Sequence, residues 1–131
     1  MINRASGLAL DNLGVSTNGA PVGQWTDGSS NNQKWVVTLQ SDGSYKLSCV
    51  TGGLYLDGMG RTTNGAPVGQ WASSSSYNEE WTIVATGSYY KLVNRTSSLR
   101  LDSLGLTANG SLVGQWADSS ANNQQWSFVT P

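Results

Sequence analysis

The octapeptide "NGAPVGQW" occupies residues 18–25 and recurs unchanged at residues 64–71. A third copy, "NGSLVGQW", occupies residues 109–116. Each copy follows a Leu-x-Leu-Asp block and precedes an Asn-(Gln/Glu)-x-Trp block, and the whole pattern returns every 45 or 46 residues. Because three ordered blocks keep their register in three copies, the sequence indicates a threefold internal repeat.

The repeats predict one domain built from short β-strands. A chain of 131 residues has the length of a single domain, and the repeats span about residues 1–42, 43–87 and 88–131. Apolar residues alternate with a period of two, and clusters of Gly, Asn and Ser separate the runs. We expect roughly four strands per repeat and one shared barrel, because a single repeat cannot bury its own apolar face. The last run, "WSFVT", is expected to pair near Met1 and finish the closure.

The composition excludes several classes of function. The net charge is -1 and no lysine or arginine cluster is present, which argues against nucleic acid as a partner. No apolar run has membrane-spanning length, so we expect no membrane contact either. Histidine is absent, which removes Ser-His and Cys-His nucleophile pairs and histidine-based zinc sites. We therefore expect neither a metal nor a cofactor.

Two further features concern processing and redox chemistry. The N-terminal "MINRASG" is typical of folded sequence and not of a signal peptide. Cys49 is the only cysteine, so no disulfide forms within the chain, and we expect a small buried residue at this position. The redox compartment stays open.

Alternation divides the tryptophans into two sets. In "WVVTL" the residues Trp35, Val37 and Leu39 share one apolar face, as Trp81 shares a face with Ile83 and Trp126 with Phe128. The tryptophans of the third block are therefore expected in the core: Trp35, Trp81 and Trp126. In "VGQW" the valine lies opposite the tryptophan, so the other set is expected to point away from the core: Trp25, Trp71 and Trp116. By the same alternation the aspartates also point outward: Asp11, Asp57 and Asp102.

An outward indole beside an outward carboxylate suits sugar recognition. An aromatic ring covers the C–H face of a pyranose, and a carboxylate accepts hydrogen bonds from neighbouring hydroxyls. A nearby amide such as Asn32 both donates and accepts, and three weak sites would gain by avidity. A structural interpretation stays open, because an aspartate at a strand end also closes an Asx turn and an asparagine also serves in turns.

The third block carries a resemblance to a known family. "QKW" at 33–35 and "QQW" at 124–126, each after a Leu-Asp strand and a Gly-x-Trp strand, resemble the Q-x-W repeat of ricin-B-type β-trefoil lectins. Carbohydrate-binding modules of family 13 share this pattern. The resemblance covers nearly the whole chain. It implies an all-β fold, the β-trefoil, in which three pseudo-symmetric four-stranded repeats form a six-stranded barrel capped by a triplet of hairpins.

The resemblance also implies one sugar pocket per repeat, with a role for each matching residue. The aspartates that grip the sugar would be Asp11, Asp57 and Asp102. The aromatic residues that stack on it would be Trp25, Trp71 and Trp116. The asparagines that contact its hydroxyls would be Asn32, Asn78 and Asn123. The glutamines that brace the aspartate from behind would be Gln33 and Gln124.

Three departures from the family pattern bear on the pockets. Glu79 stands where the other repeats have the bracing glutamine, so Asp57 and Glu79 are expected to lie close and raise one another's pKa. Repeat 2 is therefore expected to bind differently, or not at all. Glycine stands where many relatives carry a polar sugar contact, which is expected either to widen the pocket or to lose a hydrogen bond to the sugar: Gly23, Gly69 and Gly114. The disulfide that the family often carries within a repeat is missing.

The sequence predicts a non-catalytic carbohydrate-binding domain with up to three shallow, metal-free sites. The family implies mono- or oligosaccharide partners of the galactose or xylan type, and a place in a longer, secreted polysaccharide-degrading enzyme. Three alternatives remain. An enzyme would need two carboxylates about 5–10 Å apart, for which only Asp57 and Glu79 are candidates. A trefoil acting through protein contacts, as inhibitors do, would need a distinctive loop. An engineered symmetric scaffold is the third, although the drift in repeat 2 looks natural.

Overall fold

The computed structural model describes residues 1–131 and contains twelve strands, all paired antiparallel, and three single-turn 3-10 helices. Repeat 1 holds β1 (Ile2–Asn3), β2 (Ala9–Asp11), β3 (Gly23–Trp25), η1 (Asn31–Gln33) and β4 (Trp35–Leu39). Repeat 2 holds β5 (Tyr45–Cys49), β6 (Tyr55–Asp57), β7 (Gly69–Trp71), η2 (Tyr77–Glu79) and β8 (Trp81–Thr86). Repeat 3 holds β9 (Tyr89–Asn94), β10 (Arg100–Asp102), β11 (Gly114–Trp116), η3 (Asn122–Gln124) and β12 (Trp126–Ser127). None of the helices is long and apolar enough to span a membrane.

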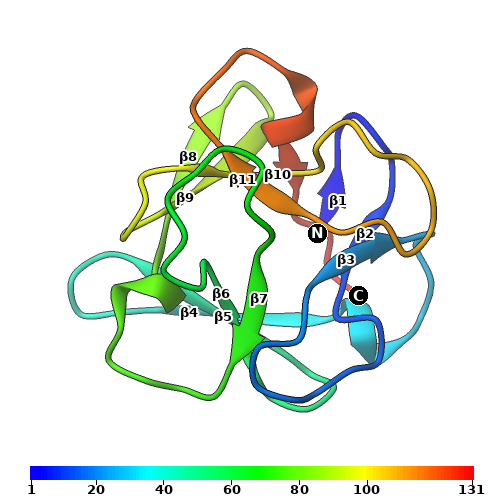
Figure 1. The fold of residues 1–131 in the computed structure, drawn as a ribbon. Helices are drawn as coiled ribbons and strands as arrows, with labels where there is room; N and C mark the ends of the chain where they lie inside the picture. The colour runs from blue at the N-terminus through cyan, green and yellow to red at the C-terminus, as the bar shows by residue number, and fades with distance from the viewer.

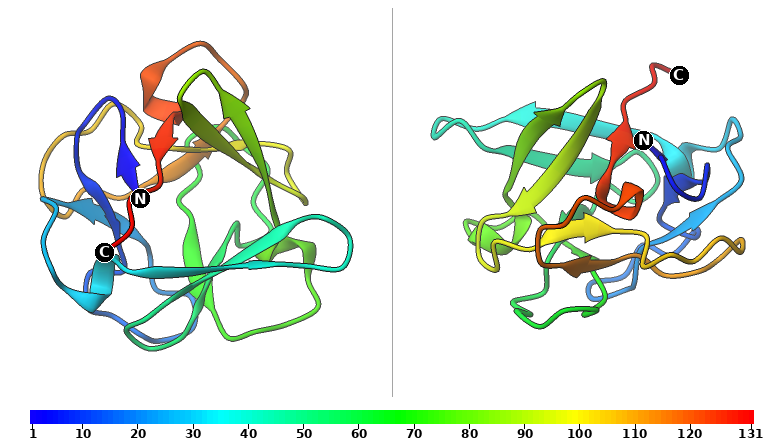
Figure 2. Two further views of the ribbon diagram at one scale, coloured as in Figure 1. Left: turned by 180° about the vertical axis from the view of Figure 1, so that it is seen from behind. Right: turned by 90° about the horizontal axis from the view of Figure 1, so that it is seen from above.

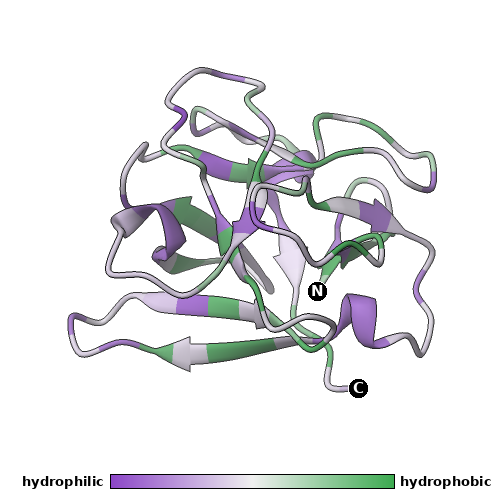
Figure 3. Ribbon diagram, turned by 60° about the horizontal axis from the view of Figure 1, so that its bottom comes forward, coloured by the Kyte–Doolittle hydropathy of each residue, from purple (hydrophilic) through white to green (hydrophobic).

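In each repeat the first and fourth strands belong to a barrel, and the second and third strands form a hairpin (Figure 1). Around the barrel the pairing runs β4–β5–β8–β9–β12–β1, and the hairpins are β2–β3, β6–β7 and β10–β11. Figure 3 shows the apolar residues on the strands and hydrophilic 3-10 turns between them. The β-trefoil predicted from the sequence is confirmed.

The predicted pairing of the two chain ends is confirmed, but it does not close the barrel completely. Ile2 lies opposite Ser127 and Asn3 opposite Trp126, and Figure 2 shows the termini side by side. No backbone pairing joins β1 to β4. The equivalent seams are closed by Tyr45 opposite Trp81 and by Tyr90 opposite Trp126, whereas β1 is only two residues long and Trp35 has no such partner.

Ten fully buried side chains form the core, and two of the three predicted core tryptophans are among them. The indole Nε1 of Trp81 donates to the Leu56 carbonyl and that of Trp126 to the Leu101 carbonyl, each at 3.0 Å. Trp35 makes the same bond to Leu10 at 3.0 Å but is only partly buried, because it lies at the open seam.

The sequence also predicted that the apolar residues sharing a face with Trp35, Trp81 and Trp126 would lie in the core. For these residues the prediction is wrong. Val37, Leu39 and Phe128 are exposed and Ile83 is only half-buried. The reason is tertiary: hairpins β4–β5 and β8–β9 extend past the barrel (Figure 2), and Phe128, which follows β12, packs edge-on against Tyr90 outside the core. Alternation gives the side of a strand on which a residue lies, but it does not show where the neighbouring layer stops.

The valines of the octapeptides join the three repeats in a ring at the pseudo-threefold axis. The Val22 N–H donates to Val68 O at 3.2 Å, Val68 N–H to Val113 O at 3.2 Å, and Val113 N–H to Val22 O at 3.1 Å. A Cβ on Gly23, the next residue, would lie 2.8 Å from the Ser111 carbonyl oxygen. The equivalent glycines of repeats 2 and 3 face carbonyl oxygens in the same way, at 3.1 and 2.9 Å. These glycines therefore allow the repeats to approach, and their effect on the width of the pockets stays a prediction.

The Asn-Gly dipeptides of the octapeptides hold the neighbouring repeat. Asn18 Oδ1 accepts from the Ala72 N–H at 2.8 Å, and a Cβ on Gly19 would lie 3.4 Å from the Trp71 ring. Asn64 and Asn109 make the same contacts to repeats 3 and 1, at 2.8 and 2.7 Å. Gly19 has φ +87°, which a side chain adopts only with strain. The octapeptide recurs because each copy forms the junction with the next repeat and packs against its tryptophan.

Candidate functional site

Each repeat has one pocket on the outside of the barrel, between the end of a hairpin and the following 3-10 turn. Each pocket combines an aspartate, a bulky apolar residue two positions later, a tryptophan and an asparagine. Site 1 contains Asp11, Leu13, Trp25 and Asn32. Site 2 contains Asp57, Met59, Trp71 and Asn78. Site 3 contains Asp102, Leu104, Trp116 and Asn123. The structure thus brings together the three residue types that the sequence selected in every repeat.

The pocket tryptophans present a large part of their rings to solvent. Trp25, Trp71 and Trp116 are 46%, 42% and 43% exposed. Each ring packs on one side against the Asn-Gly turn of another repeat. The prediction that this set is more exposed than Trp35, Trp81 and Trp126 is confirmed.

The pocket aspartates are nearly buried, although they lie outside the core. Their exposed fractions are 5%, 6% and 5% for Asp11, Asp57 and Asp102. One carboxylate oxygen of each accepts, at 2.6 Å, from the backbone N–H two residues later, on Leu13, Met59 and Leu104. The Asx turn that the sequence left open is therefore present in all three repeats, and it uses Oδ1 alone.

The residues whose backbone N–H groups donate these bonds were missed by the sequence analysis. Leu13, Met59 and Leu104 have φ of 59°, 61° and 60°, a left-handed conformation that costs a bulky residue about 1–2 kcal/mol. All three line a pocket. The signal was present, because an apolar residue stands directly before a glycine in the same turn of every repeat.

In repeats 1 and 3 a glutamine fixes the second carboxylate oxygen. Gln33 Nε2 donates to Asp11 Oδ2 at 2.9 Å and to the Thr26 carbonyl at 2.9 Å, while its Oε1 accepts from the Gly28 N–H at 2.8 Å. Gln124 repeats the arrangement with Asp102 at 3.2 Å, Ala117 at 2.8 Å and Ser119 at 3.0 Å. The amide holds each aspartate in place from the protein side, as the resemblance implied.

Repeat 2 has the same turn but lacks this donor. Glu79 is fully buried, and its Oε2 accepts from the Ser74 N–H at 3.0 Å, whereas its Oε1 has no partner. Burial raises the pKa of Glu79, and the nearby charge of Asp57 raises it further. Burial also raises the pKa of Asp57, and this effect exceeds the opposite effect of the hydrogen bond from the Met59 N–H. The expected upward direction is confirmed, but its main cause is burial, not repulsion between the two carboxylates.

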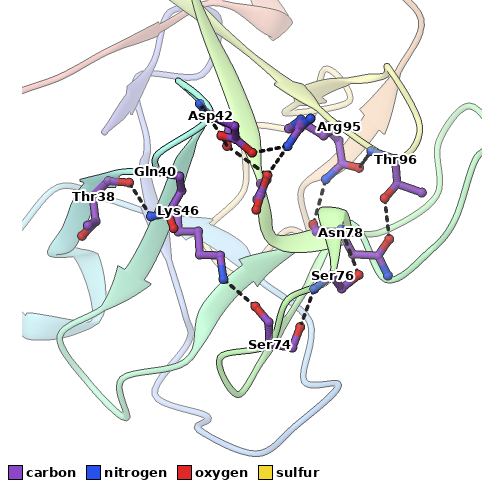
Figure 4. A network of polar contacts seen from close by, with 12 residues as sticks. Thr38, Gln40, Asp42, Lys46, Ser74, Ser76, Asn78, Arg95 and Thr96 are labelled. Atoms are coloured by element: carbon purple, nitrogen blue, oxygen red, sulfur yellow. Dashed lines mark hydrogen bonds and ion pairs between the residues drawn. The ribbon is translucent and has the colours of Figure 1, made fainter.

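The asparagines differ between the repeats. Asn32 and Asn123 make no side-chain hydrogen bond to the protein, whereas Asn78 Oδ1 accepts from Thr96 Oγ1 at 2.7 Å. Figure 4 shows polar contacts on one side of site 2, where Lys46 Nζ donates to the Ser74 carbonyl at 2.5 Å. The cavity of site 1 is also larger, about 630 Å³ against 270 Å³ for site 2 and 250 Å³ for site 3.

The family model for ricin-type β-trefoil lectin domain-like proteins matches the chain three times, over residues 1–71, 31–116 and 77–131. The chain belongs to this family. Its matches overlap and together cover the whole sequence, as expected for a repeat that recurs. No curated protein matches the chain.

Several solved structures are similar to this lectin-like domain. ThreeFoil, a designed threefold symmetric protein, is 38% identical with a TM-score of 0.91, over 95% of this chain and 92% of that one. An exo-β-1,3-galactanase from Clostridium thermocellum is 32% identical with a TM-score of 0.88; the match covers 95% of this chain but 28% of the enzyme. The ricin B-like lectin of Macrolepiota procera, solved with lactose, is 20% identical with a TM-score of 0.81, over 99% and 92% of the two chains, and shows the same fold.

No cluster of three or more His, Cys, Asp or Glu side chains that could hold a metal ion is present. Cys49 is buried, as predicted, and burial raises the pKa of its thiol to about 11. Its Sγ lies 3.4 Å from the Asn32 carbonyl, in the place where Asn94 Nδ2 donates to the Asn78 carbonyl in the next repeat. Cys49 therefore belongs to the packing behind site 1.

Proposed function

We propose that this protein is a non-catalytic carbohydrate-binding domain with up to three shallow sites for galactose-type or xylan-type residues. The observation that carries the proposal is the recurrence, in each repeat, of a pocket that combines a solvent-exposed indole with a nearly buried carboxylate held in an Asx turn. A shallow pocket with one apolar wall and a few convergent polar groups is the usual form of a small-ligand site. Membership of a lectin-like family supports it.

At each site the three side chains would divide the sugar between them. The exposed indole face covers the apolar C–H face of the pyranose. The carboxylate accepts from ring hydroxyls through lone pairs that neither the Asx turn nor the glutamine uses. The asparagine amide donates to or accepts from a further hydroxyl, which is open at Asn32 and Asn123. In this assignment the aspartate both closes its turn and contacts the sugar.

The bracing residues take no direct part in this contact. Gln33 and Gln124 are buried behind the aspartates and act by holding Asp11 and Asp102 in one orientation. Preorganisation of this kind favours binding, because less conformational freedom is lost when the sugar arrives.

Catalysis is not part of the proposal. Asp57 and Glu79 form the one candidate carboxylate pair. Glu79 is fully buried and accepts a hydrogen bond from the Ser74 backbone N–H. A general acid or nucleophile must reach the glycosidic bond, and a side chain enclosed behind Asp57 does not.

We propose that the domain serves a longer, secreted protein, and its likeness to part of a larger enzyme supports the place in a longer chain. The galactanase contains a similar domain in 28% of its length, and the Macrolepiota procera lectin was solved with lactose. A domain with several weak sites would hold a parent enzyme on a polymeric glycan by avidity. We accordingly place galactose-containing glycans first and xylan-type chains second among the ligands.

A glycan array with purified protein, followed by calorimetry with lactose, tests the proposal. Binding to β-galactosides or xylo-oligosaccharides with more than one site per chain is expected. The variant Asp11→Asn keeps an oxygen for the Asx turn but loses the charge, and should weaken one site. Asp27→Asn, an equal loss of charge at an exposed position in the same loop, is the matched control and should bind as the wild type does. No binding to any glycan on the array would refute the proposal, and hydrolysis of chromogenic glycosides would refute its non-catalytic part.

A further inference from the structure

The two carboxyl side chains behind site 2 lack the donor that sites 1 and 3 possess. We propose that Glu79 is the positioning residue of site 2. Its carboxyl group is protonated, and the O–H donates a hydrogen bond to Asp57. When this proton leaves, site 2 alone loses its sugar. The inference rests on the proposed function, since it concerns the same site. It gives repeat 2 a pH-dependent role that the other repeats do not share.

The three repeats fix which atom of Glu79 carries the proton. In sites 1 and 3 the glutamine Oε1 accepts from a loop N–H, on Gly28 and Ser119. Glu79 Oε2 makes the equivalent contact with the Ser74 N–H at 3.0 Å. The other oxygen, Oε1, therefore occupies the place of the glutamine Nε2, and it is the buried atom without a partner.

The groups that face the glutamine Nε2 in site 1 are both acceptors, and so are their counterparts around Glu79 Oε1. In site 1 the Nε2 donates to a carboxylate oxygen of Asp11 and to the Thr26 carbonyl. The counterparts in repeat 2, in sequence register, are Asp57 and the Ala72 carbonyl. An ionised Glu79 would put a third acceptor between them, and a buried acceptor without a donor costs free energy. A proton on Oε1 supplies the missing donor and restores the arrangement of the other two sites.

No cation on the neighbouring elements replaces this proton. Lys46, on β5, donates to the Ser74 carbonyl and lies over the Tyr55 ring of β6, and its charge lowers the pKa of Glu79 less than burial raises it. Arg95 lies over the Tyr77 ring and pairs with Glu80 and with Asp42, the last contact being visible in Figure 4. No salt bridge reaches Glu79 or Asp57.

Ionisation would change the site in a defined way. Below the upper apparent pKa of the pair, one proton is held between Glu79 and Asp57, and Asp57 presents a fixed acceptor to the pocket. Above it, both carboxylates are ionised with no donor between them, although Met59 and Ser74 still donate to their other oxygens, so Asp57 loses its brace. Sugar affinity at site 2 should then fall about tenfold, the equivalent of one hydrogen bond to a charged group. Sites 1 and 3, braced by neutral amides, should not respond.

The first measurement needs no sugar. Side-chain carboxyl resonances of the intact protein are followed by carbon-13 NMR from about pH 3.5 to about pH 8, a range that includes ordinary and raised carboxyl pKa values. One carboxyl pair should titrate with an upper apparent pKa above the usual range for glutamate. Glu79→Gln should abolish this step, and Gln33→Glu should create a second one behind site 1. Titration of both groups in the ordinary range would overturn the proposal.

The second measurement resolves the sites with lactose as the probe, using the indole N–H resonances of Trp25, Trp71 and Trp116. The Trp71 site should bind about tenfold more weakly at about pH 7.5 than at about pH 4.5, while the other two stay constant. Glu79→Gln should remove the dependence, and Gln33→Glu should transfer it to Trp25. Equal binding at both pH values, no binding at site 2 at either, or a dependence that calcium removes and EDTA restores would overturn the proposal.

The two measurements separate the failure of this proposal from the failure of the proposed function. If sites 1 and 3 bind lactose and site 2 shows no pH dependence, only the role of Glu79 is wrong. If the carboxyl pair titrates as expected but no site binds any glycan, the proposed function is wrong and the role at site 2 falls with it.

Discussion

Repeats 1 and 2 carry the same octapeptide letter for letter, and their pockets present the same three residue types to solvent, yet the two pockets are supported differently. Behind Asp11 a glutamine donates to the carboxylate, and behind Asp57 a glutamic acid offers only oxygens. A second difference lies beneath the octapeptide itself. Ser6 donates to Gln24 Oε1 at 2.7 Å, whereas Gln70 Oε1 has no partner because Gly52 stands in the place of the serine.

The comparison shows which positions the threefold fold constrains. The Asn, Gly, Val, Gly and Gln positions of the octapeptide that contact the neighbouring repeat are the same in all three copies, because the junction between repeats depends on them. Two residues that support the pocket and the octapeptide from behind have diverged in repeat 2, and the buried unpaired carboxyl and amide oxygens, Glu79 Oε1 and Gln70 Oε1, both lie there. Repeat 2 keeps the shape of a site while losing the polar partners behind it.

The largest expected effect would break the equivalence of the sites. Asp11→Ala removes both the charge and the Asx turn of site 1, and binding there should lose about 1.5–3 kcal/mol. Sites 2 and 3 share no residue with site 1, so calorimetry should show one fewer binding equivalent and unchanged affinity for the rest. Unchanged stoichiometry would mean that Asp11 only closes its turn.

A substitution at the junction should affect the repeats alike. Gly23→Ala forces a Cβ to within 2.8 Å of the Ser111 carbonyl, and should lower the free energy of unfolding by about 1–3 kcal/mol. Gly114→Ala should cost a similar amount, since its Cβ would lie 2.9 Å from the Ala66 carbonyl. Urea denaturation measures both. Gly28→Ala is the control, because its nearest neighbour would be 3.9 Å away and little change is expected.

In repeats 1 and 3 a serine hydroxyl donates to the glutamine of the octapeptide, and repeat 2 lacks it. Changing this contact should alter the stability less and differently in the two kinds of repeat. Ser97→Ala leaves Gln115 Oε1 without its donor at 2.8 Å and should destabilise the protein by about 1–2 kcal/mol. The reverse change, Gly52→Ser, should not stabilise it, because Gly52 has φ +82° and a Cβ there would lie 2.3 Å from Ser16. A stabilising Gly52→Ser would show that the turn of repeat 2 rearranges freely.

The smallest effect is the dependence of stability on pH. Because the pKa of Glu79 is raised in the folded state, the folded protein holds a proton that the unfolded chain releases. The stability of the wild type should therefore fall as pH rises from the unfolded pKa, about 4.3, through the raised folded value. Glu79→Gln should remove this fall and be more stable at about pH 7.5 by on the order of 1 kcal/mol. Equal pH dependence in thermal unfolding of the two proteins would contradict the assignment.

Much of the site could be predicted from the sequence because the same residue types stand at equivalent positions in all three repeats. The Leu-x-Leu-Asp and Val-Gly-Gln-Trp blocks alternate cleanly, so the outward positions of Asp11 and Trp25 follow from the two-residue period. The role of Gln33 came from the resemblance to the lectin family, and the structure places its amide where that role requires. Leu13 escaped notice because a left-handed φ is not encoded by hydropathy.

The sequence by itself determined the number of repeats, the strand pattern and the grouping of Asp, Trp and Asn, since these depend on period and order along the chain. Only the tertiary structure decided how far the barrel extends, which left Val37 and Leu39 exposed and Trp35 at an open seam. It also decided why the glycines of the octapeptides are needed, and that Glu79 Oε1 lies buried without a donor. Both depend on contacts between residues far apart in the chain, where the closeness of two backbones or two carboxyl groups is set by packing and not by sequence spacing.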